Sequence, residues 1–347
     1  MINYSDAYWG DVERVLLHIP NKEKLFGRAV LITGATGMIC SSVAEVLFYL
    51  NLKHKANIKI MLAGRNEKKM QKRFSGFREG NDYFFIRYDA TENAVMDIDA
   101  DYMIHGASNA SPVIYTEQPV ETMLANIVGL NNVLRSAVRG RSKRVLYISS
   151  SEVYGNKENN EPYRENDFGY VDILNQRASY PSAKRAAETL CIAYGQEFGL
   201  DTVIVRPGHI YGPSITETDS RASAQFTRNA VRGENIVMKS AGRQLRSYCY
   251  TLDCASAVLA VLINGTNGNA YNISNAASVV SISDIARALA EAAGKKVVYE
   301  QSTEKEKCGY NLMQNSSLDA EKLEALGWTA VFSLKEGSRK TISFFKE

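Results

Sequence analysis

The sequence predicts an α/β protein built on a doubly wound parallel sheet, with a smaller α/β lobe formed mainly by the C-terminal part of the chain. Short apolar runs alternate with longer helical stretches from residue 28 to residue 208. Most of these runs end in small or polar residues, and the alternation loosens after Pro207. Strands that alternate with helices form parallel sheets, and ligands bind at the carboxyl ends of their strands.

The individual elements follow from local patterns. An amphipathic helix is expected within residues 1–26, with apolar positions at Val12, Val15, Leu16 and Ile19, and it packs on the body of the protein or on a partner subunit. The predicted strands are 28–34, 57–64, 83–91, 100–108, 143–151 and 201–208. The predicted long helices are 41–55, 119–138 and 179–199, and a further helix covers 223–234.

The chain accordingly divides into three parts. Residues 1–26 are an N-terminal helical extension, and residues 27–206 form the domain with the parallel sheet. Residues 207–347 form mainly the smaller lobe, with some return to the sheet near 250–275.

Composition excludes several classes of protein. Lys plus Arg number 41 against 38 Asp plus Glu, a net charge of +3, whereas nucleic acid binding needs a concentrated basic face. The five cysteines are scattered without metal-ligand spacing, as in proteins of a reducing cytosol. The N-terminus lacks the features of a signal peptide, and the longest apolar stretch is about half of a membrane span. We therefore expect a cytoplasmic protein without metal, nucleic acid or membrane segment.

Residues 33–40 read TGATGMIC, between the first predicted strand and the first long helix. Gly34, Gly37 and Cys40 occupy the three positions of a G-x-x-G-x-x-G turn. The first glycine permits a tight turn, and the second lets backbone N–H groups reach a pyrophosphate at the helix N-terminus. Cysteine is small enough for the third position, where helix and strand approach each other. The turn predicts a dinucleotide-binding Rossmann domain.

The end of the second strand selects between the two nicotinamide dinucleotides. An acidic residue there binds the ribose hydroxyls of NAD, and an arginine suits the 2′-phosphate of NADP. This chain has no carboxylate there and carries Arg65 at the tip, which favours NADP unless Arg65 stacks on adenine or faces solvent. Asp89, after the next strand, can accept a hydrogen bond from the adenine amino group.

Tyr180 and Lys184 are four residues apart and therefore lie on one face of the predicted helix 179–199. A free tyrosine has a pKa of about 10. The Lys184 ammonium, the helix N-terminus and an oxidised nicotinamide all favour the tyrosinate. Tyr180 is therefore a candidate base for a sugar or alcohol hydroxyl. A strand end reading SSSE (149–152) precedes it by about thirty residues.

Together these motifs resemble the extended short-chain dehydrogenase/reductase family, the NAD-dependent epimerases and dehydratases of nucleotide-activated sugars. The resemblance runs from about residue 28 to about residue 277, with weaker similarity to the end. Further family segments appear as RPGHIYGP (206–213) and GRQLRSYCYTLD (242–253). The UDP-glucuronate decarboxylases are the most similar branch, through HGASNASPVIY (105–115), SSEVYG (150–155) and NQRASY (175–180).

The resemblance implies roles for four catalytic residues. Ser150 matches the Ser/Thr that hydrogen-bonds the substrate hydroxyl beside Tyr180. Lys184 would hold the nicotinamide ribose and tune Tyr180. Glu152 matches the acidic residue that decarboxylases and dehydratases have near C5 of the sugar, and its alternative role is to cap a turn. C4 epimerases usually lack a carboxylate at this position.

The resemblance also implies binding residues. Arg246 matches an arginine that meets the nucleotide diphosphate or the sugar carboxylate, with a surface arginine as the alternative. The cofactor-binding candidates are Gly34, Thr36, Gly37, Met38, Ile39, Arg65, Asp89, Ala90, Ala107, Ser108, Asn126, Tyr180, Lys184 and Pro207. The substrate-binding candidates are Ser151, Arg177, His209, Gln225 and Arg246.

The chain departs from the family pattern at four positions. Cys40 replaces the third glycine, and the cofactor-selecting acid is missing. His209 replaces the usual substrate-facing Asn. Ser151 stands where 4,6-dehydratases with an Asp–Glu pair have Asp, although some GDP-mannose dehydratases also resemble this chain there.

The sequence therefore predicts an enzyme that transiently oxidises C4 of a nucleotide-linked hexose or hexuronate. A UDP-glucuronate decarboxylase leads, ahead of a dTDP-, CDP- or GDP-glucose 4,6-dehydratase and then a 4-epimerase. A cofactor-sensing protein without turnover is the rival of another class. Because the reduced cofactor can return its hydride, tightly held NAD is expected, with NADP as the alternative. The family also implies a homodimer formed through two long helices per subunit.

Overall fold

A parallel sheet forms the centre of the larger part of the molecule, as predicted. The computed structural model describes residues 4–216, 219–301 and 313–346. The strands of this sheet are β1 (Ala29–Thr33), β2 (Lys59–Gly64), β3 (Phe84–Arg87), β4 (Tyr102–His105), β5 (Arg144–Ile148), β6 (Thr202–Pro207) and β10 (Asn269–Ile273). Their order is β10-β6-β5-β4-β1-β2-β3, and every pair is parallel.

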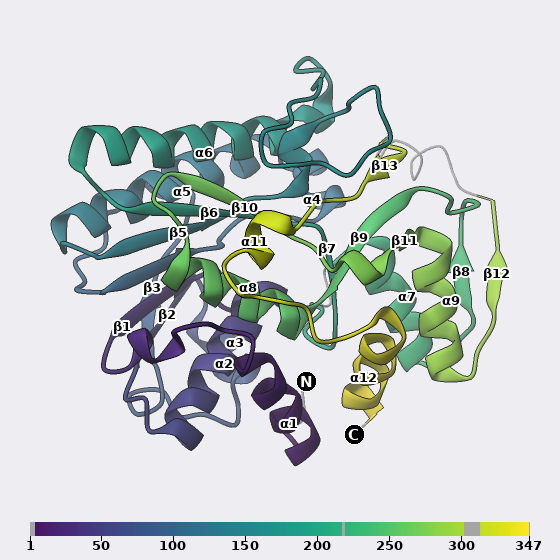
Figure 1. The fold of residues 1–347 in the computed structure, drawn as a ribbon, viewed down its shortest axis with the longest axis horizontal. Coiled ribbons are helices and arrows are strands. Elements are labelled where there is room, and N and C mark those ends of the chain that lie inside the picture. The colour runs from purple at the N-terminus through teal and green to yellow at the C-terminus, as the bar shows by residue number, and fades with distance from the viewer. Residues whose placement is uncertain (1–3, 217–218, 302–312, 347) are drawn as a thin grey trace.

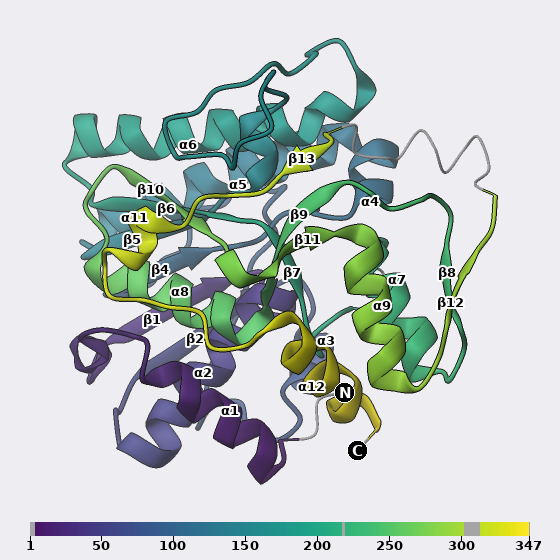
Figure 2. The same ribbon diagram turned by 45° about the vertical axis from the view of Figure 1, so that its right-hand side comes forward.

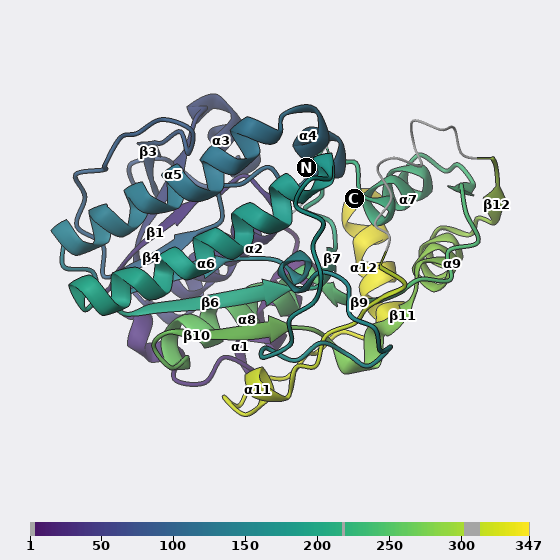
Figure 3. The same ribbon diagram turned by 90° about the horizontal axis from the view of Figure 1, so that it is seen from above.

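Helices cover both faces of this sheet (Figures 1 and 3). One face carries α5 (Pro119–Arg139) and α6 (Ser179–Phe198), and the other carries α2 (Met38–His54) and α8 (Thr251–Asn264). Alternate side chains of β1 serve the two faces, because successive residues of a strand point in opposite directions. Val30 and Ile32 join the core with α2 and α8, whereas Leu31 joins the core under α5 and α6. The sheet is therefore buried on both faces, which explains its apolar strands.

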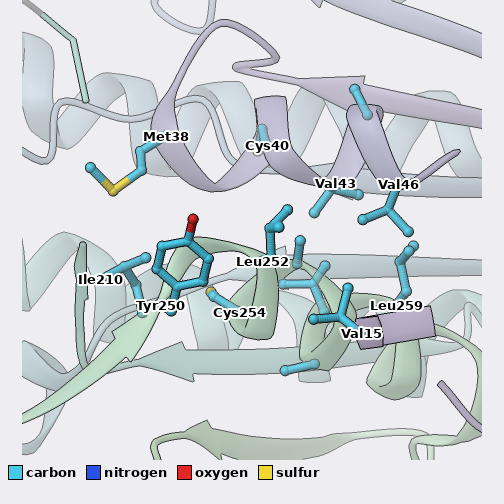
Figure 4. Packing of buried hydrophobic residues seen from close by; sticks show 14 of the residues in the cluster. Val15, Met38, Cys40, Val43, Val46, Ile210, Tyr250, Leu252, Cys254 and Leu259 are labelled. Atoms are coloured by element: carbon cyan, nitrogen blue, oxygen red, sulfur yellow. The ribbon is translucent and has the colours of Figure 1, made fainter. Parts of the chain in front are cut away.

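The packing of α2 against α8 is visible in Figure 4, where Val43 and Val46 of α2 face Leu252 and Leu259 of α8. All four side chains are fully buried. Residues 251–273 thus return to the larger part of the molecule, with α8 on the sheet and β10 beside β6.

The N-terminal helix belongs to the same core. α1 (Asp6–Leu16) begins at Ser5, whose side chain accepts a hydrogen bond from the backbone N–H of Tyr8. Tyr8, Val12 and Val15 are fully buried, and the helix contacts α2 and α8. Of the two expected packing modes, the structure has the one on the body of the protein. The short 3-10 helix η1 (Lys22–Leu25) follows where the sequence reads PNKEK.

A smaller lobe lies beside the carboxyl ends of the strands (Figure 2). Its helices are α7 (Ala222–Val231), α9 (Ile282–Ala293) and α12 (Leu334–Lys346). One of its sheets contains β7 (His209–Tyr211), β9 (Leu245–Tyr250), β11 (Val279–Ser281) and β13 (Asn315–Ser316), and a second sheet pairs β8 (Ile236–Met238) with β12 (Val297–Tyr299). β9 pairs with three neighbours, so it is the central strand of the four-stranded sheet.

Short helices complete the fold. They are α3 (Glu67–Arg73), α4 (Pro112–Glu117), α11 (Glu321–Glu324), η2 (Ser151–Tyr154), η3 (Gln176–Ala178) and η4 (Ala276–Ser278). Within the described ranges, no helix combines the length and the apolar character that a membrane span requires. Four cysteines are free and buried, at positions 40, 191, 249 and 254, and Cys308 lies outside the described residues.

The chain order of the sheet positions the site. The first three strands proceed outward from β1 to one edge, and β4 then returns to the opposite side of β1. Loops at the carboxyl ends of β1 and β4 therefore leave in opposite directions, which opens a crevice at this point of a doubly wound sheet. The candidate residues from the glycine turn, the β4 end and the β5 end all follow these strands.

Candidate active site

The glycine turn connects β1 to α2 with a geometry that only glycine permits. Gly34 has φ +68°, and a Cβ there would lie 2.8 Å from backbone atoms of Gly106 and Ala107. Gly37 is the N-cap of α2, and its backbone N–H donates to the Gly34 carbonyl at 2.9 Å. No side chain caps this helix end, so the N–H groups of the first turn, at Met38 and Ile39, can hold a phosphate.

Cys40 at the third position is matched by a glycine on the neighbouring strand end. Cys40 is 3% exposed, and a methyl group on Gly106 would overlap the Cys40 sulfur. Gly106, which directly follows β4 and has no side chain, therefore leaves room for the Cys40 side chain of α2. This explains how the turn keeps its form without a third glycine.

The ends of β2 and β3 form the part of the crevice expected to hold adenosine. Arg65 is exposed, and no acidic residue stands at the end of β2. Asp89 accepts hydrogen bonds from the Thr91 N–H at 3.0 Å and the Thr91 hydroxyl at 2.8 Å. Burial tends to raise the pKa of Asp89, but these bonds and the nearby Arg65 and Arg87 lower it below its usual value. Ala90 is buried next to Gly129 of α5.

Residues after β4 add a polar group to the crevice. The hydroxyl oxygen of Ser108 is buried and has no hydrogen-bond partner among the described residues. A bound dinucleotide would supply a partner for this hydroxyl, and its phosphates would bind the uncapped N-terminus of α2 in the glycine turn. Ala107 and Thr36 line the same turn, and both are half-buried. Asn126 of α5 is instead engaged within the protein, donating to the Thr122 carbonyl and accepting from the Tyr147 hydroxyl at 3.1 Å.

Ser150, Tyr180 and Lys184 lie together at the carboxyl end of β5. Ser150 is the N-cap of η2, and its hydroxyl accepts from the backbone N–H of Glu152 at 3.2 Å. The Ser150 hydroxyl lies close enough to the Tyr180 phenol to lower its pKa. The Lys184 ammonium lies 5.7 Å from the centre of the Tyr180 ring and donates to the Ile148 carbonyl at 2.7 Å. The structure therefore unites the three residues that the sequence placed on a strand end and a helix.

The pKa of Tyr180 differs from the sequence-based expectation of an acidified phenol. Burial raises the pKa of Tyr180 to about 12, and Glu152 also raises it, while the Ser150 hydroxyl and the charge of Arg221 lower it. Burial also lowers the pKa of Lys184 to about 7, against the effect of Glu188. The physical reason is that desolvation disfavours both charged forms, and that Lys184 is directed to the Ile148 carbonyl.

Glu152 is part of a network that sequence reasoning found only in part. Its carboxylate pairs with Arg177 at 2.9 Å, and Arg177 also donates to the Tyr115 hydroxyl at 2.8 Å. The Tyr115 ring stacks on Tyr180, with ring centres 5.0 Å apart and planes 15° apart. Tyr115 was not among the candidates. The signal that could have found it is its position as the last residue of the HGASNASPVIY segment.

Three arginines converge on His209 at the border of the smaller lobe. Burial and the charges of Arg246, Arg221 and Arg177 lower the pKa of His209 to about 3, so its ring is neutral. Arg221 pairs with Asp219 at 2.6 Å and donates to the Met38 sulfur at 3.6 Å. The Nδ1 atom of His209 is buried without a hydrogen-bond partner among the described residues.

Arg246 is a buried cation without a close acid. It is 2% exposed and donates to the Leu245 carbonyl at 2.7 Å. Among the residues that the structure describes, no carboxylate forms an ion pair with it, and Glu152 acts on it only at longer range. Burial lowers the pKa of Arg246. A buried cation is costly unless an anion compensates it, so this part of the site suits a phosphate or carboxylate.

The remaining candidates are less closely connected. Ser151 is buried as the first residue of η2, and Pro207 ends β6 beside the same crevice. Gln225 is exposed on α7, outside the network of contacts around Tyr180 and Arg246.

Comparison with known proteins identifies the family. The model of the NAD dependent epimerase/dehydratase family matches residues 30–274, and the chain belongs to this family. Over 330 residues it is 28% identical to UDP-glucuronic acid decarboxylase 1 of Xenopus tropicalis, covering 92% of this chain and 72% of that protein. Over 313 residues it is 29% identical to UDP-glucuronic acid decarboxylase 3 of Arabidopsis thaliana, covering 89% of this chain and 86% of that protein.

Solved structures agree on the fold. UDP-glucose 4-epimerase of Thermotoga maritima, solved with UDP-glucose, has a TM-score of 0.78 and 23% identity, covering 91% of this chain and 98% of that one. dTDP-glucose 4,6-dehydratase of Bacillus anthracis, solved with NAD, has a TM-score of 0.73 and 17% identity, covering 92% and 96%. The likeness confirms the predicted fold class.

Proposed function

We propose that this protein is an NAD-dependent enzyme that oxidises C4 of a nucleotide-linked hexuronate and releases its C6 carboxylate as carbon dioxide, as a UDP-glucuronate decarboxylase does. The observation that carries the proposal is the Ser150–Tyr180–Lys184 group, together with the buried Arg246, which has no paired acid among the described residues. The similarity to decarboxylases along about nine tenths of the chain supports the same reaction.

NAD is the proposed cofactor. The glycine turn would hold its phosphates, Ser108 would lie on its nicotinamide side, and Asp89 would lie near its adenine. When bound, NAD supplies an acceptor for the C4 hydride and can return it. Solved relatives contain NAD, which favours NAD over NADP. The exposed Arg65 is the feature that would suit the 2′-phosphate of NADP, and the two cofactors are compared in the experiment below.

The chain's own residues account for the movement of the proton. In its phenolate form, which the positive charge of a bound oxidised nicotinamide would favour, Tyr180 is the base that takes the proton of the C4 hydroxyl, and Ser150 hydrogen-bonds the same substrate oxygen. Lys184 supplies a positive charge within 5.7 Å of the phenol ring. Once C4 is a ketone, a C6 carboxylate makes the sugar a β-keto acid. The bond between C5 and C6 then breaks, its electron pair moves toward the ketone as an enolate, and C5 is protonated afterwards.

The positive charges around His209 suit the anionic groups of such a substrate. Arg177 is already neutralised by Glu152 and Arg221 by Asp219, whereas Arg246 has no paired acid among the described residues. Arg246 is therefore the residue proposed for the diphosphate or for the sugar carboxylate. A substrate without negative charge would leave this cation buried and uncompensated.

A 4,6-dehydratase is the second candidate, because Glu152 could remove the C5 proton of a 4-keto hexose while water leaves from C6. Its carboxylate is held in place by the ion pair with Arg177, 2.9 Å away. Ser151 stands where many dehydratases have an acid, which makes this reaction the less favoured one. A 4-epimerase comes third, and a cofactor sensor without turnover would need none of the catalytic group.

The deciding experiment incubates the purified protein with NAD or NADP and a panel of nucleotide-linked hexoses and hexuronates, read by mass spectrometry. Loss of carbon dioxide from a hexuronate supports the proposal. Loss of water supports the dehydratase, and an isobaric product separated by chromatography supports the epimerase. The absence of any product across UDP, dTDP, CDP and GDP sugars, in protein shown to bind NAD, would contradict all three and favour the sensor.

We further propose a cytoplasmic homodimer. The exposed apolar side chains of Val120, Met123 and Leu124 on α5 and Phe198 on α6 support association through these two long helices. Light scattering after size-exclusion chromatography measures the mass, and a monomer at micromolar concentration would contradict the dimer.

Free cysteines among the described residues are consistent with a reducing compartment such as the cytoplasm. Microscopy of the tagged protein tests this proposed location.

A further inference from the structure

A buried ion pair lies directly behind the proposed catalytic group. Glu188 of α6 is 9% exposed, and the guanidinium of Arg206 in β6 donates to both of its carboxylate oxygens, at 3.0 and 2.6 Å. The Ser149 hydroxyl donates to the same carboxylate at 2.5 Å. Neither Glu188 nor Arg206 has a part in the reaction proposed above. A fully hydrogen-bonded buried pair of this kind holds its position well.

Glu188 and Lys184 fasten α6 to the end of β5 at two consecutive residues. Lys184 donates to the carbonyl of Ile148, and Glu188 accepts from the side chain of Ser149. The next residue is Ser150, whose hydroxyl lowers the pKa of Tyr180 at the start of the same helix. The distance between Ser150 and Tyr180 is therefore set by two connections one helical turn apart.

Glu188 is also the anion that faces Lys184. Within the described part of the chain, the titratable side chains that act on Lys184 are Cys40, His105, Tyr147, Tyr180, Glu188 and Cys191. Burial raises the pKa of both thiols and both phenols and lowers the pKa of His105 to about 3. These five groups are therefore uncharged at neutral pH. Glu188 itself is faced by Arg185, Arg206 and Tyr154.

We propose that Glu188 is a positioning residue, whose carboxylate favours the ammonium form of Lys184 and which clamps the strand end carrying Ser150 against the helix carrying Tyr180. The inference rests on the proposed function in so far as Tyr180 and Lys184 are the catalytic pair. Arg206 holds the Glu188 carboxylate in place. From this position the carboxylate acts electrostatically on Lys184. The clamp joins α6 to β6 and to the carboxyl end of β5.

The test measures the titration of Lys184 itself. Protein labelled with ¹³C at the lysine Cε is titrated by NMR, and the Lys184 signal is assigned by its loss in Lys184→Arg. Replacing Glu188 by Gln keeps the shape but removes the charge, so the Lys184 midpoint should move down by about one pH unit. Glu188→Asp keeps the charge and should restore most of the wild-type midpoint. The matched control is Glu197→Gln, an exposed acid on the same helix, which should change nothing.

An unchanged midpoint in Glu188→Gln would overturn the proposal, and so would equal shifts in Gln and Asp, because a merely structural role disturbs both alike. If Glu188→Gln does not fold, the double variant Glu188→Leu with Arg206→Met replaces the whole pair by apolar side chains, which buried pairs often tolerate. Its Lys184 midpoint should also fall, and an unchanged midpoint overturns the proposal again. Since this titration needs neither cofactor nor substrate, it gives a result even if the proposed function fails.

In enzyme that turns over, the same variants provide a second readout. Glu188→Gln should shift the alkaline limb of the kcat profile to lower pH, with KM changed less than kcat. A uniform loss at every pH would contradict the charge role.

Discussion

Tyr180 illustrates how much of a catalytic residue's chemistry depends on its surroundings. Burial raises the pKa of its phenol to about 12, so the hydroxyl is protonated at neutral pH. Ser150 and Arg221 work in the opposite direction, and added positive charge near the phenol would lower the pKa further. The stacked Tyr115 ring holds the Tyr180 ring in one orientation. Such a residue is prepared for proton transfer by position first and by pKa second.

Tyr180→Phe removes the hydroxyl without disturbing the stacked ring. We expect kcat on the substrate identified by the panel to fall by about 10²–10⁴-fold, because a positioned base contributes that much. Product formation measured by mass spectrometry checks this, with unchanged NAD binding as evidence of an intact fold. The matched control is Tyr170→Phe, since Tyr170 is 69% exposed, and it should keep full activity. Full activity in Tyr180→Phe would remove the basis of the proposed mechanism.

His105 supplies a prediction about stability and pH. It is fully buried in β4 with Nδ1 2.8 Å from the Thr33 hydroxyl, and burial lowers its pKa to about 3. In the unfolded chain a histidine has a pKa of about 6.5. Below pH 6.5 the unfolded state therefore binds a proton that the folded state rejects, so stability is lost as the pH falls. Between pH 7 and pH 5 this costs about 2 kcal/mol.

Urea unfolding of the wild type and of His105→Asn at pH 7 and pH 5 checks this expectation. The variant's loss of unfolding free energy on acidification should be smaller by about 2 kcal/mol. His54→Asn is the control, because His54 is exposed at the end of α2 and should leave the difference unchanged. Equal losses in wild type and His105→Asn would show that His105 does not titrate as proposed.

At the scale of elements, the junction of β1, α2 and β4 explains the unusual glycine turn. Gly34 requires glycine because of its positive φ and the nearby backbone of Gly106. The third position of the turn tolerates Cys40 because Gly106 leaves room for the sulfur. The requirement for a small residue is thus shared between two elements far apart in the sequence. A motif read along one segment cannot reveal such an exchange.

A double-mutant cycle tests this exchange. Gly106→Ala should lower the free energy of unfolding by about 1–3 kcal/mol, because the added methyl group overlaps Cys40. Cys40→Gly, combined with Gly106→Ala, should recover most of that loss and keep the glycine turn able to bind NAD. Thermal and urea unfolding measure the coupling between the two positions. Additive effects of the two substitutions would contradict direct packing between them.

The N-terminal helix α1 takes part in the contact between the sheet domain and the smaller lobe. α1 packs on α2 and α8, and its Asp11 and Arg14 form ion pairs with Lys340 and Glu336 of α12 in the smaller lobe. The Tyr8 ring contacts Phe344 of the same helix. The N-terminal helix therefore connects the sheet domain to the smaller lobe, and the site lies between these two parts. Its loss would affect both.

Leu16 and its neighbour Leu17 test whether α1 is part of the hydrophobic core. Leu16 is 1% exposed, whereas its neighbour Leu17 is 77% exposed. Leu16→Ala should lower the free energy of unfolding by about 2–5 kcal/mol, and Leu17→Ala should change it by less than about 0.5 kcal/mol. Calorimetry or urea unfolding measures both. Similar values for the two variants would mean that α1 is not part of the core.

The sequence allowed most of the sheet domain to be predicted, because each parallel strand is buried on both faces and appears as an apolar run. Strands β1 to β6 and helices α2, α5 and α6 lie where the pattern predicted them. The secondary structure of the smaller lobe was predicted less completely. Its strands β7, β8, β11, β12 and β13 are only two or three residues long, too short to give a periodic pattern in the sequence. Within the site, Ser150, Tyr180 and Lys184 were named from spacing and resemblance together.

By itself, the sequence determined the alternation of elements, the glycine turn and the residue types of the catalytic group, because these depend on neighbours along the chain. Only the tertiary structure decided which charges meet. It pairs Glu152 with Arg177, leaves Arg246 without a paired acid among the described residues, and sets Glu188 behind Lys184. The reason is physical: pKa values and ion pairs depend on distance and burial in space, and residues that lie far apart in sequence supply both.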